Sequence, residues 1–186
     1  MRCHGRVIYS LPMQRAELID RIRRDALLRG EFTLRSGRTS KYYLDKYLFE
    51  TQPDILETLG KMFAGHIDDS IDRLAGAELG GIPLVAVTSI ISGLPCVLIR
   101  NRKKSYGTAK QLEGRLNPGD RVMIVEDIAT SGGQVLEAAR TISDQGGQVT
   151  KIVAAVDREE GARQNIEGAG YRFESLLTKS DLGISE

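Results

Sequence analysis

Residues 122–134 read VMIVEDIATSGGQ, and this stretch decides how the chain folds. An apolar run at 122–125 leads into two adjacent carboxylates, Glu126 and Asp127, and a Thr-Ser-Gly-Gly turn follows at 130–133. A short apolar run bounded by turn residues is consistent with a buried strand. The pattern therefore predicts a strand that ends at two acids and a glycine-rich loop that leads away from it.

Apolar strands alternate with helical patterns along the rest of the chain. Strands are expected at 71–75, 95–100, 121–126, 151–157 and 171–177. Helices are expected from Ser10 or Pro12 to Gly30, from Pro53 through Phe63, at 134–145 and at 161–167, whereas 81–93 fits either a strand or a helix. Strands that are apolar on both faces and alternate with helices indicate an α/β fold with a parallel sheet covered on two sides.

Composition narrows the class of protein. The chain has 186 residues, which fits a single domain over 1–186. Its 26 basic and 25 acidic residues give a net charge of +1, which argues against binding nucleic acid through bulk positive charge. Two cysteines, Cys3 and Cys96, form no disulfide framework, and no secretory signal or membrane span is visible. We therefore expect a cytoplasmic protein that binds neither nucleic acid nor membrane.

The turn after Asp127 has the features of a phosphate site. In open α/β sheets, ligands bind beyond the carboxyl ends of the strands. Gly132 and Gly133 let the backbone approach a ligand, and the next helix offers free N–H groups. Two carboxylates would repel a bare phosphate, so the pattern favours a sugar phosphate whose hydroxyls face the acids, with Mg²⁺ nearby. The alternative is that Asp127 caps the helix and the glycines form an ordinary turn.

The commoner phosphate signatures are absent from the sequence. Neither GxxxxGK[ST] nor GxGxxG follows any expected strand. A P-loop nucleotide hydrolase and a dinucleotide-dependent enzyme are therefore disfavoured.

VMIVEDIATSGG closely resembles the phosphoribosyl-diphosphate motif of the type I phosphoribosyltransferases. The resemblance implies the fold of that family, a mainly parallel central sheet flanked by helices with a small N-terminal hood from about residues 1–50. It also implies that Glu126 and Asp127 contact the ribose hydroxyls and that the turn holds the 5′-phosphate. The residues expected to contact the activated sugar here, besides the two acids, are Ile128, Ala129, Thr130, Ser131, Gly132, Gly133 and Gln134.

Three further stretches resemble the orotate phosphoribosyltransferases within that family. They are FTLRSGRTSKYYLD at 32–45, RNRKKSYGTAKQLEG at 100–114 and AVDREEG at 155–161. The resemblance implies that Arg35 contacts the phosphoribosyl diphosphate and that Arg158, Thr130, Tyr43 and Leu44 line the orotate pocket. Two alternatives stay open: Arg158 as a surface partner of Glu159 or Glu160, and Tyr42 and Tyr43 as core residues under the hood.

The charged segment at 100–115 is expected to be a mobile catalytic loop. Aligned on Tyr106 and Gly107, the resemblance places Arg100 at the family's arginine, Lys104 at its catalytic lysine and Tyr106 at its aromatic position. Asn101 stands where the family has a further lysine, and Arg102 or Lys103 is a possible substitute. The other interpretations are a solvated charged loop or a basic patch for nucleic acid. In the family this loop closes over the neighbouring subunit's site, which implies a homodimer.

The resemblance leads to one predicted reaction. Orotate and 5-phosphoribosyl 1-diphosphate, with Mg²⁺ held mainly by the substrate, give orotidine 5′-monophosphate and pyrophosphate in UMP biosynthesis. Lys104, Asp127 and Glu126 are the expected catalytic residues, and no set of protein ligands to the metal is expected. The alternatives are a phosphoribosyltransferase for another nucleobase and a regulator that senses phosphoribosyl diphosphate.

Overall fold

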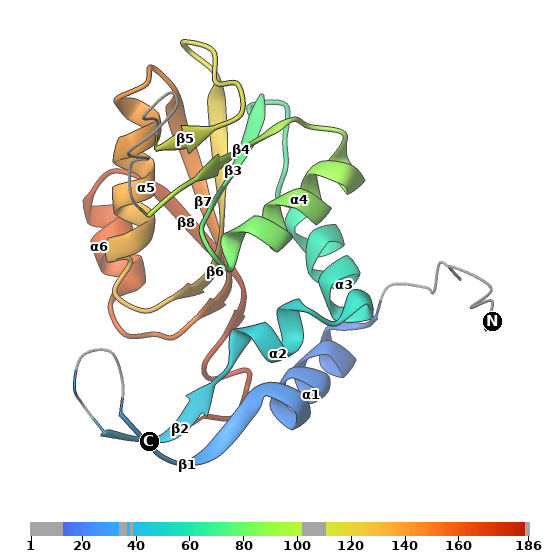
Figure 1. Ribbon diagram of the computed structural model, residues 1–186. Helices are drawn as coiled ribbons and strands as arrows, with labels where there is room; N and C mark the ends of the chain where they lie inside the picture. The colour runs from blue at the N-terminus through green and yellow to red at the C-terminus, as the bar shows by residue number, and fades with distance from the viewer. Residues whose placement is uncertain (1–12, 34–36, 38, 102–110, 185–186) are drawn as a thin grey trace, which may run out of the picture.

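The computed structural model describes residues 13–33, 37, 39–101 and 111–184. At its centre lies a six-stranded sheet in the order β5-β4-β3-β6-β7-β8 (Figure 1). Its strands are β3 (Arg73–Ala77), β4 (Cys96–Ile99), β5 (Leu112–Glu113), β6 (Arg121–Ala129), β7 (Gln148–Asp157) and β8 (Arg172–Thr178). All neighbours pair in parallel except β4 and β5. The predicted α/β fold with a mainly parallel sheet is confirmed.

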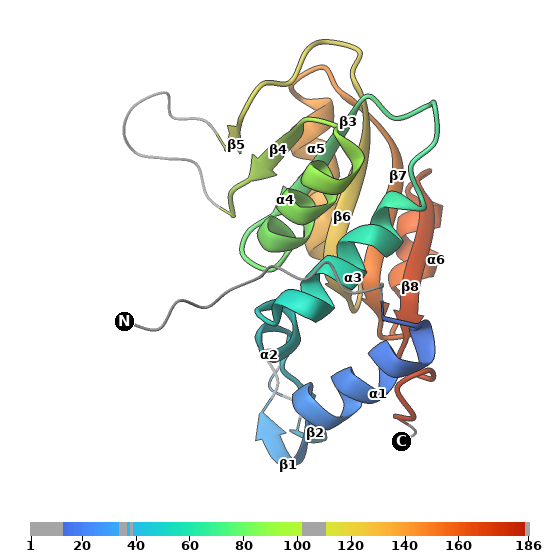
Figure 2. The ribbon, with the colours of Figure 1, turned by 90° about the vertical axis from the view of Figure 1, so that its right-hand side faces the viewer.

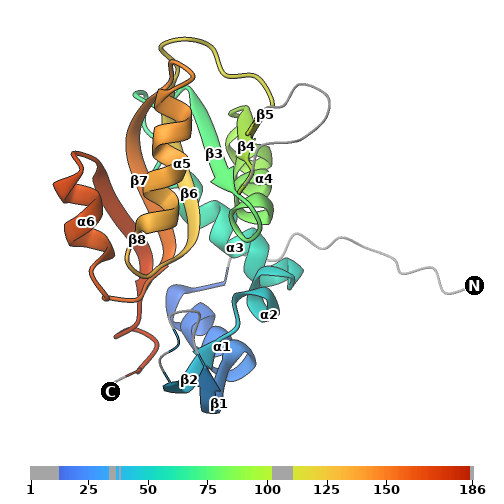
Figure 3. The ribbon, with the colours of Figure 1, turned by 60° about the vertical axis from the view of Figure 1, so that its left-hand side comes forward.

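Helices cover both faces of this sheet, because the strand β6 is apolar on both faces. Met123 and Val125 pack in the cluster that includes α3 (Pro53–Ala64) and α4 (Gly81–Ser92). Val122 and Ile124, which alternate with them, pack instead with α5 (Gly133–Ser143) and α6 (Ala162–Gly168). Figure 3 shows α5 and α6 on one side of the sheet and α3 and α4 on the other. The two-residue period of β6 thus fixes the three layers.

The N-terminal hood forms a separate small layer beyond the carboxyl end of β6 (Figure 2). It consists of α1 (Arg15–Ala26), β1 (Leu27–Thr33), β2 (Thr39–Leu44) and α2 (Lys46–Glu50). The two strands pair antiparallel, with Leu27 opposite Leu44. Leu18, Ile22 and Phe49 are fully buried, so the hood is anchored on the main core.

Several predicted boundaries were wrong, among them the start of β7, which lies at Gln148, three residues before its predicted start. The first helix ends at Ala26, before the predicted end at Gly30, because Leu27 and Leu28 pair with β2 and strand pairing there overrides the helical spacing. Strand β6 runs to Ala129, three residues past its predicted end, because Ile128 and Ala129 still pair with β7. Glu126 and Asp127 therefore lie inside the last part of the strand.

The structure also settles one ambiguous prediction and contains elements that were not predicted. The ambiguous stretch at 81–93 is the helix α4, which ends at Gly93 in the left-handed conformation, with a φ of 75°. The hood strands β1 and β2, the helix α2 and the short strand β5 were not predicted. Within the described ranges, no helix combines the length and the apolar character needed to cross a membrane.

Candidate active site

The acid pair predicted from the sequence is buried at the end of β6. Glu126 is 5% exposed and Asp127 is 6% exposed. Burial raises the pKa of Glu126, the negative charge of Asp127 raises it further, and Lys46 opposes both effects. The two acids are consecutive and buried, and the charge of Asp127 acts on Glu126.

Lys46, at the start of α2, forms an ion pair with Asp127. Its Nζ donates a hydrogen bond to Oδ2 of that carboxylate, while Oδ1 accepts the backbone N–H of Ile128. The helix α2 begins at this point because Asp45 caps it, accepting the N–H of Tyr47 at 3.1 Å. Lys46 was not predicted from the sequence, although its place directly after the Tyr-Tyr-Leu-Asp signature is a usable signal.

Glu50 lies one helical turn after Lys46, on the same face of α2. It is 1% exposed, and neither carboxylate oxygen has a hydrogen-bond partner among the described residues. Burial raises the pKa of Glu50 to about 9, with a further contribution from Asp127. At neutral pH this side chain is therefore a neutral carboxylic acid, and the sequence analysis missed it too.

The turn after β6 has the geometry of a phosphate cradle. Gly132 adopts a φ of 79°, and a Cβ at this position would lie 2.9 Å from Cγ1 of Ile166. Ser131 is held by Asn165, whose Nδ2 donates to the Ser131 carbonyl at 2.9 Å. The helix α5 starts at Gly133. Its first backbone N–H groups, which have no partner within the helix, therefore lie at this turn. The predicted glycine-rich turn from strand to helix is confirmed.

A second glycine-rich loop, Glu78 to Gly81, lies beside the acid pair. A Cβ on Gly80 would collide with Oδ2 of Asp127, so only glycine fits there. Gln134, which was predicted to contact the sugar, donates from Nε2 to the Glu78 carbonyl at 3.2 Å. This loop was missed, although the glycine-rich sequence GAELGG directly follows an apolar strand.

The described start of the charged loop meets the same edge of the sheet. The backbone N–H of Asn101 donates to Oε1 of Glu78 at 2.7 Å, and that of Arg100 donates to the carbonyl of Gln111 at 2.8 Å. The buried Nε of Arg100 has no hydrogen-bond partner in the described part of the chain. Arg35, Arg102, Lys103, Lys104 and Tyr106, which the sequence analysis also named, lie outside the described residues.

Arg158 connects the end of β7 to the hood. Its backbone N–H donates to the carbonyl of Ala129 at 2.9 Å, which places it beside the end of β6. Nη2 donates to the phenolic oxygen of Tyr42 at 2.8 Å and pairs with Glu160 at 2.9 Å. The alternative that Arg158 pairs with an acidic neighbour is correct for Glu160. Its contact with orotate stays a prediction.

The other predicted orotate contacts lie in different surroundings. Tyr43 is 42% exposed, with its ring centroid 5.7 Å from that of Phe32. Leu44 is buried in the core under the hood. Thr130 is half-buried at the turn. Their contacts with orotate stay predictions.

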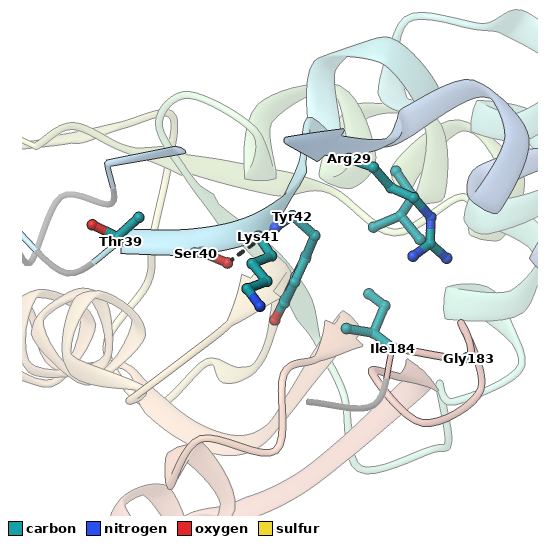
Figure 4. A pocket seen from close by; sticks show the side chains of 8 residues that line it. Arg29, Thr39, Ser40, Lys41, Tyr42, Gly183 and Ile184 are labelled. Carbon is teal, nitrogen blue, oxygen red and sulfur yellow. Dashed lines mark hydrogen bonds between the residues drawn. The ribbon is translucent and has the colours of Figure 1, made fainter. Parts of the chain in front are cut away.

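A cavity of about 580 Å³ opens between the hood hairpin and the C-terminal segment (Figure 4). Tyr42 lines it, together with Leu27, Arg29, Thr39, Ser40, Lys41, Gly183 and Ile184. It includes neither residue of the acid pair, so it is not the predicted sugar site. Through Tyr42 it adjoins Arg158.

Comparison with known proteins agrees with this geometry. Residues 49–169 match the family described as "Phosphoribosyl transferase domain". The orotate phosphoribosyltransferase of Haloquadratum walsbyi is 45% identical over 87% of this chain and 88% of its own, and that of Natronomonas pharaonis is 44% identical over 91% and 98%. The Mycobacterium tuberculosis orotate phosphoribosyltransferase in complex with 5-phospho-α-D-ribosyl 1-diphosphate superposes with a TM-score of 0.76 at 31% identity, covering 91% of this chain and 99% of that one. The Aeropyrum pernix orotate phosphoribosyltransferase superposes with a TM-score of 0.78 at 27% identity, covering 91% of this chain and 96% of that one.

The buried acid pair, the cradle at α5 and the similarity to these relatives lead to one conclusion. The chain belongs to the orotate phosphoribosyltransferases of the type I family.

Proposed function

We infer that the chain transfers the phosphoribosyl group from 5-phosphoribosyl 1-diphosphate to orotate, giving orotidine 5′-monophosphate and pyrophosphate. The observation that carries this inference is the acid pair Glu126–Asp127 at the end of β6, directly before the cradle at α5. An acid pair beside an anion site suits a ligand with hydroxyls on one side and a phosphate on the other. The identity of 44–45% to orotate phosphoribosyltransferases supports orotate as the base.

The acid pair is proposed to hold the ribose and to stabilise its reacting carbon. When the bond from C1 to the diphosphate oxygen breaks ahead of the new C–N bond, positive charge develops on the sugar. Carboxylates fixed in a buried site stabilise such charge more than solvated ones do, because they need no reorganisation. Glu126 and Asp127 are 5% and 6% exposed, so little bulk water surrounds them.

The 5′-phosphate is proposed to sit at the turn from Ala129 to Gly133. The N-terminus of α5 supplies free N–H groups and a partial positive charge worth roughly 0.3–1 kcal/mol per nearby anion. Gly132 adopts a φ of 79° at this turn, a conformation that glycine reaches without strain. Ile128 and Gln134 flank the cradle and complete this proposed contact set.

Orotate is proposed to bind through its carboxylate to Arg158. A guanidinium matches a carboxylate with two parallel hydrogen bonds. Arg158 is pre-positioned by Tyr42 and by its backbone bond to Ala129. Thr130, Tyr43 and Leu44 are proposed to shape the rest of the pocket.

The leaving diphosphate is proposed to be neutralised by the loop at 100–115. Positive groups that meet the charge as it develops lower the barrier to the reaction. Arg100 and Asn101 lie at the sheet edge near Glu78, where such a group would depart. Arg35, Lys104 and Tyr106 complete the proposed contacts.

Mg²⁺ is proposed as the cofactor. Among the described residues there is no group of three or more His, Cys, Asp or Glu side chains that would hold a metal ion. We propose that the ion would be carried mainly by oxygens of the substrate, beside the acids Glu126 and Asp127. Bound there, Mg²⁺ neutralises charge on the diphosphate.

We further propose a cytoplasmic homodimer in which the loop at 100–115 completes the neighbouring active site. The proposed enzyme acts in pyrimidine biosynthesis and needs neither nucleic acid nor membrane. A water-excluding loop of this kind protects the ribosyl centre from hydrolysis.

One assay tests the proposed function. Orotate absorbance is followed after addition of phosphoribosyl diphosphate and Mg²⁺, with adenine, guanine, hypoxanthine and uracil as competing bases. We expect orotate to be consumed with equimolar release of pyrophosphate. Turnover of another base in its place would favour a different phosphoribosyltransferase. Tight binding of phosphoribosyl diphosphate without turnover of any base would favour a sensing regulator.

A further inference from the structure

The ion pair between Lys46 and Asp127 joins the hood to the acid pair. Lys46 is the second residue after the hood strand β2, whereas Asp127 belongs to the central strand of the main sheet. The Lys46 side chain is 27% exposed and that of Asp127 is 8% exposed. The ammonium group therefore lies at the boundary between solvent and the buried acids.

The surroundings of this ion pair are strongly acidic. The groups that act on Lys46 and its neighbours are Asp45, Tyr47 and Glu50 from α2 and Glu126 and Asp127 from β6. Within this set Lys46 is the one cation, so it alone offsets the mutual repulsion of the carboxylates. Consistent with this, Asp127 and its hydrogen bond raise the pKa of Lys46 against the effect of its burial.

Asp127 is held in place from three sides. Lys46 contacts Oδ2, the Ile128 amide contacts Oδ1, and Gly80 packs against Oδ2 so closely that no side chain fits between them. Removing the ammonium group would leave Oδ2 with Gly80 beside it and no cation. The Asp127 carboxylate would then be free to turn, and the pKa of the neighbouring Glu126, which Lys46 lowers, would rise further. A protonated acid accepts hydrogen bonds from sugar hydroxyls poorly.

We propose that Lys46 is a positioning residue for the activated sugar: it fixes the Asp127 carboxylate and balances its charge, so that the acid pair is ready to accept the ribose hydroxyls. The inference rests on the proposed function, because it assigns Asp127 to the sugar. It adds a residue from the hood to the sugar site, outside the motif on β6.

The test measures binding of Mg²⁺·phosphoribosyl diphosphate by titration calorimetry without any base. Lys46→Met removes the charge, Lys46→Gln keeps a donor without charge, and Lys46→Arg keeps the charge. Lys61→Met is the matched control, because Lys61 also forms a lysine–carboxylate pair on a helix, with Glu57 at 2.6 Å, and its side chain is similarly exposed at 33%. Thermal unfolding of each variant establishes that it is folded.

If the proposal holds, Lys46→Met and Lys46→Gln weaken binding of the sugar about tenfold near neutral pH. A tenfold loss is expected when about one molecule in ten has its acid pair in the arrangement that binds the sugar. Lys46→Arg and Lys61→Met bind as the wild type does. Because Lys46 lowers the pKa of Glu126, its removal leaves more of that acid protonated near neutral pH, and the loss of binding shrinks as the pH is raised. A residue with a merely structural role would lower the melting temperature without this dependence on pH.

Two outcomes would overturn the proposal. One is Lys46→Met binding the sugar as tightly as Lys61→Met across the pH range. The other is folded Lys46→Arg binding as weakly as Lys46→Met. The proposed function fails separately: a wild-type protein that binds the sugar but consumes no orotate would refute the reaction and leave the role of Lys46 standing.

Discussion

The phenolic oxygen of Tyr42 accepts a hydrogen bond from Nη2 of Arg158 at 2.8 Å, and this bond links the hood to the end of β7. The guanidinium also lies 5.4 Å from the centre of the Tyr42 ring, and it is paired with Glu160. Arg158 is thus held between a neutral and an acidic partner. A ligand carboxylate that binds Arg158 would therefore have to compete with Glu160.

Arg158→Ala is expected to raise the KM for orotate selectively. Loss of a hydrogen bond to a charged group costs about 1.5–3 kcal/mol, which corresponds to roughly a 10- to 150-fold increase in KM. Tyr42→Phe removes the neutral hydrogen-bond partner of Arg158 and should raise the KM for orotate only about 2- to 10-fold. Steady-state kinetics with each substrate varied in turn measure the effect, and Arg163→Ala, on the outer helix α6, is the control. An equal rise in KM for both substrates would contradict the assignment of Arg158 to orotate.

Asp127→Asn is expected to impair the reaction with every base. The amide removes the negative charge that favours positive charge on the ribose, and it loses the ion pair with Lys46. We expect kcat to fall by about a hundredfold or more, in line with the loss of one pre-positioned electrostatic group. Single-turnover measurements separate this effect from substrate affinity. Unchanged kcat in the folded variant would show that Asp127 does not act on the reacting sugar.

The sequence predicted those parts of the site that lie on one continuous segment. The run from Val122 to Gly133 carries a strand, two acids and a turn in order, and each of these depends on local pattern: apolar character, charge and glycine. The strand-to-helix transition and the buried sheet followed from the same run.

Residues that depend on contacts between distant segments were missed. Lys46 and Asp127 are 81 positions apart, and no periodicity in either segment relates them. The protonated state of Glu50 results from burial by several elements, whereas its sequence neighbourhood suggests an ordinary surface acid. The end of the first helix was misplaced for the same reason, since the pairing of Leu27 with Leu44 is a tertiary effect.

Gly132→Ala is expected to destabilise the protein and weaken binding of the activated sugar. Its φ of 79° costs an L-residue roughly 1–2 kcal/mol, and the added Cβ would also press on Ile166. Urea unfolding followed by circular dichroism measures the loss. Gly168→Ala, in the last turn of α6 where a Cβ meets no other atom within 4 Å, is the matched control and should not destabilise. Equal stability of the two variants would mean that the turn tolerates a side chain.

The free energy of unfolding is expected to contain a contribution from Glu50 that falls as pH rises. The pKa of Glu50 is about 9 in the folded protein, against an ordinary value of 4.5, so the folded state binds the proton more tightly than the unfolded state. The stabilisation is complete below about pH 4.5 and is lost progressively as pH rises towards about 9. Glu50→Gln, which stays neutral, should reduce this loss, while the raised pKa of Glu126 leaves part of it in place. Urea titrations between about pH 6 and 9 test this, and parallel curves for the two proteins would refute a buried neutral Glu50.

Lys104→Ala is expected to lower turnover far more than affinity for phosphoribosyl diphosphate, because its charge is proposed to act on the departing diphosphate. Mixed dimers test where it acts. If loops act across the dimer, a subunit with Lys104→Ala and one with Asp127→Asn together form one intact site, whereas both homodimers have none. Random pairing of equal amounts then restores about a quarter of wild-type activity, since half of the dimers are mixed and each has one working site. Activity that stays at the level of the separate variants, with mixed dimers demonstrated by differential tags, would place each loop over its own subunit.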